Sequence, residues 1–220
     1  MTLTDMASSA DGSVTVHNCV TSGTFSLDGG TWDVDNNVWV LGTDTECFVI
    51  DPAHDPQSVH QAVNGRTVRG ILLTHGHDDH IRAARDTAAL IGGHIHLHPA
   101  DRMLWDTVYP DAAPDRDLTD GEVFTLGTIT LTVLSTPGHS PGSVCFYSPE
   151  LGVVFSGDTL FHGGPGATGR SYSDFPTIVS SIRERLLVLP ESTKVFTGHG
   201  ESTVIGQEAQ DVEEWLARGH

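Results

Sequence analysis

The stretch Thr74-His75-Gly76-His77-Asp78-Asp79-His80 decides the interpretation of this chain. It places three imidazoles and a metal-binding carboxylate within six residues, directly after the apolar run Ile71-Leu72-Leu73. Divalent ions such as zinc favour imidazole nitrogen and carboxylate oxygen as ligands. Ligands that lie on one turn lose little loop entropy when an ion binds. The stretch therefore predicts a metal site where a strand runs into a loop.

Three more candidate ligands lie far downstream, each in a glycine-rich turn that follows an apolar stretch. They are His139 in Thr136-Pro137-Gly138-His139-Ser140-Pro141-Gly142, Asp158 in Ser156-Gly157-Asp158-Thr159, and His199 in Thr197-Gly198-His199-Gly200. Strand, sharp turn and ligand recur at each place. This recurrence is expected if several strands end at one edge and direct side chains into a shared cleft.

Taken together and in this order, the motifs resemble those of the metallo-β-lactamase superfamily, and within it the glyoxalase II-like hydrolases. The resemblance extends from about Val14 to Ile205. It is carried by H-x-H-x-D-H at His75 to His80, G-H-S-P-G-S at 138–143, G-D-T-L-F at 157–161 and G-H-G at 198–200. A lone H-x-H would be weak, but four ordered motifs are highly specific.

The resemblance implies an α/β fold, a four-layer αββα sandwich, with two divalent metal ions at the active site. Zinc is the expected metal, and iron or manganese is compatible with the same ligands. The implied ligands are His75, His77 and His139 for one ion and Asp79, His80 and His199 for the other, with Asp158 bridging the two. The two carboxylates, Asp79 and Asp158, are the implied catalytic residues. In the family an aspartate at Asp51 supports the site from behind.

The function that the resemblance implies is hydrolysis of a small thioester, or of a related ester or lactone, by a hydroxide that the two ions share. An oxidoreductase of the persulfide dioxygenase type, with a single iron, is the alternative. A β-lactamase is less favoured, because the best-known enzymes of that kind have a cysteine where Asp158 stands and usually an arginine where His80 stands.

Two departures from the family bear on the substrate. Only 21 residues follow His199, so the helical domain that binds glutathione in glyoxalase II is expected to be absent, and residues 1–220 are expected to form a single domain. The segment that resembles the family's G-R-x-D motif is longer by two residues between Arg170 and Asp174. The roles of Arg170, Tyr172 and Asp174, and of His162 just beyond the Asp158 turn, stay open.

Composition fits an enzyme that acts on small molecules. The apolar fraction of 38% is sufficient for a core, and no apolar run of membrane-spanning length or signal-peptide pattern is present, so we expect no membrane partner and a cytoplasmic location. The cysteines Cys19, Cys47 and Cys145 are expected to be buried and reduced. With 29 acidic and 11 basic residues the formal charge is −18, which argues against a nucleic-acid partner.

Hydrophobic patterning predicts alternating strands and helices. Strands are expected at Ser13–Val20, Val38–Leu41, Cys47–Ile50, Val68–Leu73 and His94–Leu97, and several more within Val123–Phe155. Helices are expected at Gln57–Asn64, Asp79–Ile91, Asp101–Val108, Thr177–Leu187 and Ala209–Ala217.

The remaining histidines have weaker patterns. His94, His96 and His98 alternate, so they share one side of a strand, where a half-exposed strand face is favoured over a second metal site. The others have no partner pattern and are interpreted as surface or loop residues: His17, His54, His60, His162 and His220.

Overall fold

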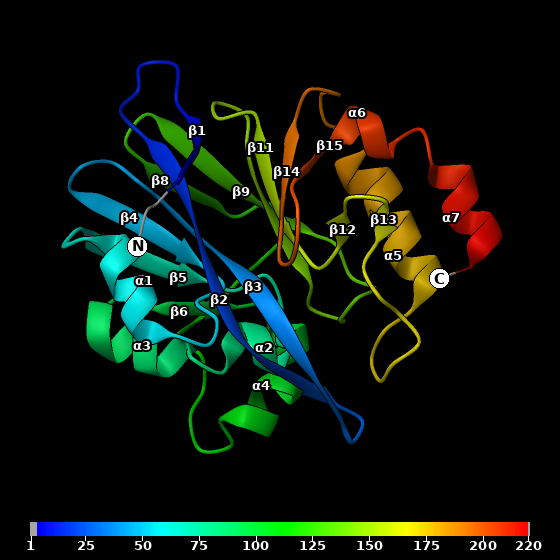
Figure 1. Ribbon diagram of the computed structural model, residues 1–220, viewed down its shortest axis with the longest axis horizontal. Coiled ribbons are helices and arrows are strands. Elements are labelled where there is room, and N and C mark those ends of the chain that lie inside the picture. Colours follow the sequence, from blue (N-terminus) through cyan, green and yellow to red (C-terminus); the bar gives the residue numbers. More distant parts are fainter. Residues whose placement is uncertain (1–3, 220) are drawn as a thin grey trace.

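Two β-sheets pack face to face, and helices cover the outer face of each, in the computed structural model, which describes residues 4–219 (Figure 1). This arrangement confirms the αββα sandwich that the motifs imply. Among the described residues, no helix is long and apolar enough to cross a membrane.

The first sheet has seven strands in chain order. They are β1 (Thr4–Ser8), β2 (Thr15–Leu27), β3 (Gly30–Gly42), β4 (Glu46–Ile50), β5 (Thr67–Leu72), β6 (Ile95–Leu97) and β7 (Arg116–Asp117). The strands β1 to β4 pair antiparallel, whereas β4 to β7 are parallel. The carboxyl ends of the parallel strands therefore meet at one edge, and the loop that begins at Thr74 leaves the sheet there.

The second sheet has six strands, in the order β15-β14-β11-β10-β9-β8. Their bounds are β8 (Val123–Leu126), β9 (Ile129–Ser135), β10 (Val144–Ser148), β11 (Val153–Gly157), β14 (Lys194–Thr197) and β15 (Thr203–Val204). The strands β11 and β14 are parallel, so the turns that follow them lie side by side. A small two-stranded sheet joins β12 (Leu160–Phe161) to β13 (Gly164–Pro165).

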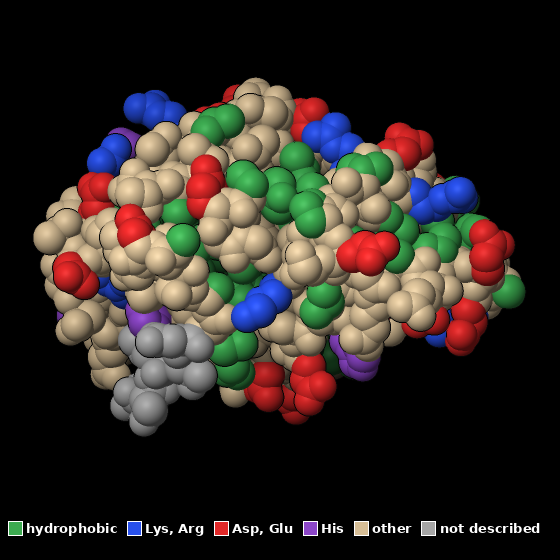
Figure 2. All heavy atoms as spheres, turned by 90° about the horizontal axis from the view of Figure 1, so that it is seen from above, with side chains coloured by type: hydrophobic (Ala, Val, Ile, Leu, Met, Phe, Trp, Pro, Cys, Tyr) green, Lys and Arg blue, Asp and Glu red, His purple; other side chains and the backbone are tan. Residues whose placement is uncertain are grey.

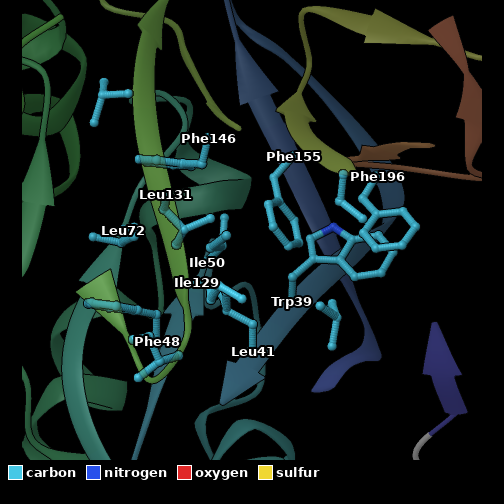
Figure 3. Packing of buried hydrophobic residues seen from close by; sticks show 14 of the residues in the cluster. Trp39, Leu41, Phe48, Ile50, Leu72, Ile129, Leu131, Phe146, Phe155 and Phe196 are labelled. Atoms are coloured by element: carbon cyan, nitrogen blue, oxygen red, sulfur yellow. The ribbon is translucent and has the colours of Figure 1, made fainter. Parts of the chain in front are cut away.

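The core between the two sheets contains a cluster of aromatic rings from β3, β11 and β14. Trp39 of β3 stacks on Phe196 of β14, with ring centroids 4.4 Å apart, and meets Phe155 of β11 edge-on (Figure 3). The Trp39 indole nitrogen donates to the carbonyl of Thr197, at the start of the turn that carries His199. Burial of these large rings fixes β11 and β14, and hence their following turns, against the first sheet.

Helices bury their apolar faces on the outside of the two sheets. On the first sheet lie α1 (Pro56–Val63), α2 (Asp78–Ile81), α3 (Ala84–Ile91), a 3₁₀ turn (Pro99–Asp101) and α4 (Arg102–Val108). On the second lie α5 (Phe175–Ser181), which continues as a π-helical turn (Ile182–Leu186), then α6 (Ile205–Glu208) and α7 (Val212–Arg218). The cysteines Cys19, Cys47 and Cys145 are buried, as expected, and they form no disulfide among the described residues.

The single helix predicted over Asp79–Ile91 is wrong, because the structure divides it into α2 and α3. The hydroxyl of Tyr109 lies 3.0 Å from the carbonyl of Ile81 and 3.5 Å from the amide of Arg85. The hydroxyl therefore replaces the hydrogen bond that the amide of Arg85 would donate to the carbonyl of Ile81 in a continuous helix. The break leaves α2 as a single turn that carries two of the candidate ligands.

Other elements differ in extent. The strand expected at Val38–Leu41 is the end of β3, which forms a long hairpin with β2. The strands β1 and β7 were not expected from the sequence. The terminal helix expected at Ala209–Ala217 is present as α7, which begins three residues later, at Val212, whereas α6 ends before the expected range. Polar residues dominate the tip of the hairpin, so the apolar pattern gave no signal for it.

Charged side chains are dispersed over the face that Figure 2 shows. On the face shown in Figure 2, lysine and arginine side chains lie among acidic and uncharged ones and form no broad basic patch.

Candidate metal centre

All seven candidate ligands gather at one edge of the sandwich. The loop after β5 carries His75 and His77, and α2 carries Asp79 and His80. The turns after β9, β11 and β14 carry His139, Asp158 and His199. Two of these turns follow neighbouring parallel strands, which explains why residues far apart in sequence meet here.

The first group consists of His75, His77 and His139, whose potential ligand atoms lie within 4.8 Å of one another. Nδ1 of His77 is 2.9 Å from Nε2 of His139. All three rings are buried, and Nε2 of His75 has no hydrogen-bond partner among the described residues. Buried nitrogen atoms that converge without partners suit a divalent ion.

The second group consists of Asp79, His80 and His199, again within 4.8 Å. Nε2 of His199 lies 3.2 Å from Oδ2 of Asp79 and 3.2 Å from Nε2 of His80. His80 is fully buried, whereas the His199 side chain keeps 24% of its surface exposed. This group is therefore open to solvent on one side.

Asp158 lies between the two groups. One carboxylate oxygen is 3.5 Å from Nε2 of His139 and 3.3 Å from Nε2 of His199, and the other is 3.4 Å from Nε2 of His80. The neighbouring Gly198 leaves room for it, because a Cβ there would lie 2.2 Å from Oδ1 of Asp158. The glycine of this turn is thus explained by close approach.

The outward nitrogen of three rings is held by an oxygen acceptor. Nδ1 of His80, His139 and His199 lies 3.0, 2.9 and 2.8 Å from Oδ2 of Asp51, the carbonyl of Ala167 and the carbonyl of Asp35, respectively. An oxygen acceptor requires Nδ1 to carry the hydrogen. Nε2, on the side of each ring that faces the centre, can then offer its lone pair to a metal. The rings are therefore oriented for metal binding.

A third possible group, Asp51 with His75 and His80, is explained differently. Oδ1 of Asp51 accepts from the amide of Thr74 at 2.7 Å, and Oδ2 accepts from the Thr74 hydroxyl at 2.6 Å and lies 3.0 Å from His80. Both oxygens are thus occupied. Asp51 orients His80 and fixes the start of the loop.

The charges at the centre perturb the titration of the second group. Burial alone would raise the pKa of Asp79, but His80 and His199 lower it to about 2. Burial alone would lower the pKa of His199, but the carboxylates of Asp158 and Asp79 raise it to about 10. The pKa of His80 is likewise raised above its usual range, by Asp79, Asp158 and Asp51 against the effect of burial. This concentration of negative charge attracts cations.

The sequence profile of the metallo-beta-lactamase superfamily matches residues 31–199. The chain belongs to this superfamily. It is 36% identical over 181 residues to the probable metallo-hydrolase YqgX of Bacillus subtilis, covering 76% of this chain and 86% of that protein. It is 34% identical over 175 residues to hydroxyacylglutathione hydrolase GloC of Haemophilus influenzae, covering 73% of this chain and 82% of that protein.

Two solved structures of the superfamily are also similar. TTHA1623 in a di-iron-bound form superposes with a TM-score of 0.71 at 34% identity, over 80% of this chain and 93% of that one. The B3 metallo-beta-lactamase BLEG-1 superposes with a TM-score of 0.73 at 32% identity, over 86% of this chain and 97% of that one. The comparisons therefore support a metal-dependent hydrolase, and the histidine and aspartate clusters described above suit divalent metal.

A buried carboxylate joins the two loops of this metallo-hydrolase that carry the first group. Asp101 accepts hydrogen bonds from the amide of Gly76 at 2.8 Å and the amide of Gly142 at 2.6 Å. It also accepts from the hydroxyl of Ser140 at 2.6 Å. Gly76 lies between His75 and His77, and Ser140 follows His139, so Asp101 fixes both loops relative to each other. No sequence motif singled it out.

The hairpin of β2 and β3 forms a wall beside the first group. Phe25 lies with its ring centroid 5.3 Å from that of His77. The guanidinium of Arg170 stacks over Trp32, 3.8 Å from its centroid, and is 5.6 Å from that of Phe25. The backbone amide and hydroxyl of Ser171 donate to the Asp28 carboxylate at the hairpin tip. The hairpin and the 163–174 loop are thus held together.

The three polar residues of the G-R-x-D-like segment lie in different surroundings. Asp174 caps α5, accepting from the amide of Thr177 at 2.8 Å, whereas Arg170 stacks on the hairpin and Tyr172 is exposed. Nδ1 of His162 lies 3.2 Å from the side-chain nitrogen of Gln207, and His162 is in none of the groups of potential metal ligands among the described residues.

The other described histidines form no further group of potential metal ligands. Within residues 4–219, every group of three potential ligands lies at the centre described above, and none includes His94, His96 or His98. His96 packs edge-on against Phe124. His54 lies in the loop between β4 and α1, as expected, and its Nε2 is 2.7 Å from Oδ1 of Asn36. His220 lies outside the described residues.

Proposed function

We propose that this metallo-hydrolase cleaves small acyl thioesters with two divalent ions, most suitably zinc. His75, His77 and His139 would hold one ion and Asp79, His80 and His199 the other, with Asp158 between them. The observation that carries the proposal is the placement of Asp158 within 3.5 Å of nitrogen atoms from both groups. The 34% identity to a hydroxyacylglutathione hydrolase supports a thioester as the substrate class.

The ions, when bound, would polarise the carbonyl of the substrate and lower the pKa of a bound water towards about 7. The residues of the chain would hold the ions in place and shape the site around the substrate. The Nδ1 contacts of His80, His139 and His199 keep three rings aimed inward, and Asp51 keeps its position through Thr74. Phe25 would exclude water from one side of the acyl group.

A consequence concerns protons. In the metal-free protein the pKa of His199 is about 10, since Asp158 and Asp79 outweigh burial, and the pKa of His80 is also raised. Burial instead lowers the pKa of His77 to about 3 and keeps that of His75 below its usual range. At pH 7.5 we therefore expect protons on the second group but none on His75 or His77.

Because a metal binds the neutral imidazole, the ion at the second group must displace protons. Its affinity should therefore rise with pH up to about 10, where His199 loses its proton unaided. Calorimetric titration of metal-free protein with zinc, in two buffers of different ionisation heat, measures the release directly. Equal release for both ions, or proton uptake, would contradict the assignment.

A panel of acyl thioesters tests the proposed function. The panel should vary the thiol, glutathione included, and the acyl group. Hydrolysis is expected with the metal-replete protein, should disappear after chelation and should return when zinc is added. Oxygen consumption with a persulfide, and no hydrolysis of any thioester, would instead identify the single-iron oxidoreductase.

A further inference from the structure

The loop between β4 and α1 lies behind the second group and is backbone-strained at two positions. Asp51 has φ of 49° and His54 has φ of 55°, a region that residues with a Cβ rarely adopt. Such strain persists where surrounding contacts hold it in place. Here the loop is held at both ends, because Ala53 accepts from Thr21 and Asp55 caps α1. Asp51 already has a role, so His54 remains to be explained.

The ring of His54 occupies space that the fold keeps free. It lies against Gly23, in the interior of β2, where a Cβ would be only 2.1 Å from Nδ1 of the ring. Glycine weakens a strand interior and often marks a place where another group approaches closely. The strand therefore has a glycine at the point where the His54 ring inserts.

From this position His54 reaches a metal ligand through one intermediate. Nδ2 of Asn36 donates to Oδ2 of Asp79 at 3.1 Å, and Oδ1 of Asn36 lies 2.7 Å from Nε2 of His54. The carboxylate accepts only, so the amide nitrogen of Asn36 faces it and the amide oxygen faces His54, whose Nε2–H donates. Asn36 is fully buried.

The chain of hydrogen bonds from His54 through Asn36 to Asp79, called the relay below, fixes the orientation of the Asn36 amide. Without His54, the buried amide oxygen of Asn36 would lose its donor, and the side chain would no longer be held where its nitrogen reaches Asp79. With His54 in place, only one orientation satisfies both neighbours. The oxygen so fixed, Oδ2 of Asp79, is the one that lies 3.2 Å from Nε2 of His199.

We infer that His54 is a positioning residue for the second metal site, acting through Asn36 on Asp79. Asp51 orients His80 and His54 orients Asp79, so one strained loop holds two adjacent ligands from behind. The inference rests on the proposed function in that it requires an ion at Asp79, His80 and His199. It predicts an effect on that ion alone, since no member of the relay touches the first group.

Zinc affinities of the two sites, measured on the full-length protein by competition with a chelating indicator, test this inference. His54→Gly, which suits a positive φ, should weaken one ion by at least about 10-fold and leave the other unchanged. His54→Gln, which can still donate near Nε2, should recover most of the loss. His60→Ala, an exposed histidine of α1, is the matched control and should bind both ions like the wild type.

Absorption of the cobalt-substituted protein gives a second readout, because a reoriented Asp79 changes the ligand field of one ion. Asn36→Ala should reproduce the His54→Gly spectrum, and the double variant should be no worse than Asn36→Ala alone. Equal weakening of both ions, full affinity in His54→Gly, or no recovery in His54→Gln would overturn the inference. Metal affinity is read without substrate, so a wild type that binds two ions but cleaves no thioester would contradict the proposed function alone.

Discussion

Asp158→Ala is expected to lower thioester hydrolysis by at least about 10²-fold, a barrier increase of about 2.7 kcal/mol. Asp158 contacts nitrogen atoms of both groups, so its loss removes a ligand from each ion and leaves their positive charges unscreened between His80, His139 and His199. Metal content should fall with the rate. Steady-state kinetics and metal analysis on the same preparation measure both.

Two variants make the result interpretable. Asp158→Asn keeps the shape of the side chain and one oxygen, so it should retain more metal than Asp158→Ala. Asp111→Ala removes an exposed carboxylate from the loop after α4 and should leave rate and metal content unchanged. If Asp158→Ala keeps two ions and the full rate, the assignment of a bridging carboxylate is wrong.

Small acyl thioesters should be cleaved with kcat/KM at least about 10²-fold above β-lactams, again a difference of about 2.7 kcal/mol. A thiolate, whose conjugate acid has a pKa near 8.5, departs without a proton, whereas an amine needs a positioned general acid. The carboxylates nearest the ligand histidines are Asp51, Asp79 and Asp158. Asp51 contacts Thr74 and His80, and Asp79 accepts from Asn36. Asp158 lies between the two groups, so none of the three is available as a general acid.

Similarity to the BLEG-1 β-lactamase makes this comparison decisive, since identity to it is close to that with the thioester hydrolase. One metal-replete preparation should be assayed side by side with a thioester and with several β-lactams. β-Lactams turned over as fast as the thioesters would show that the chain supplies a proton to the leaving amine, and the substrate class proposed here would be wrong.

The sequence alone indicated which residues the structure brings together, because these residue types form a recognisable pattern. His75, His77 and His80 crowd into one loop, and the downstream ligands stand in glycine turns after apolar strands. The αββα sandwich was expected from the family resemblance that these motifs carry and from the order of the expected strands and helices, and the structure confirms it.

What the sequence did not reveal depends on contacts without a residue signature. Backbone carbonyls of Asp35 and Ala167 orient two of the rings, and any residue offers a carbonyl. The position of His54 depends on a glycine in another strand. The division between α2 and α3 depends on Tyr109, which is distant in sequence and whose insertion no periodicity can indicate.

Titration of the metal-free protein with zinc, followed by thioester hydrolysis, tests the central claim most directly. The account predicts that the rate rises to a plateau at two ions per chain, because both groups and the Asp158 between them are needed. A plateau at one ion, or full activity with one iron accompanied by oxygen uptake, would contradict it.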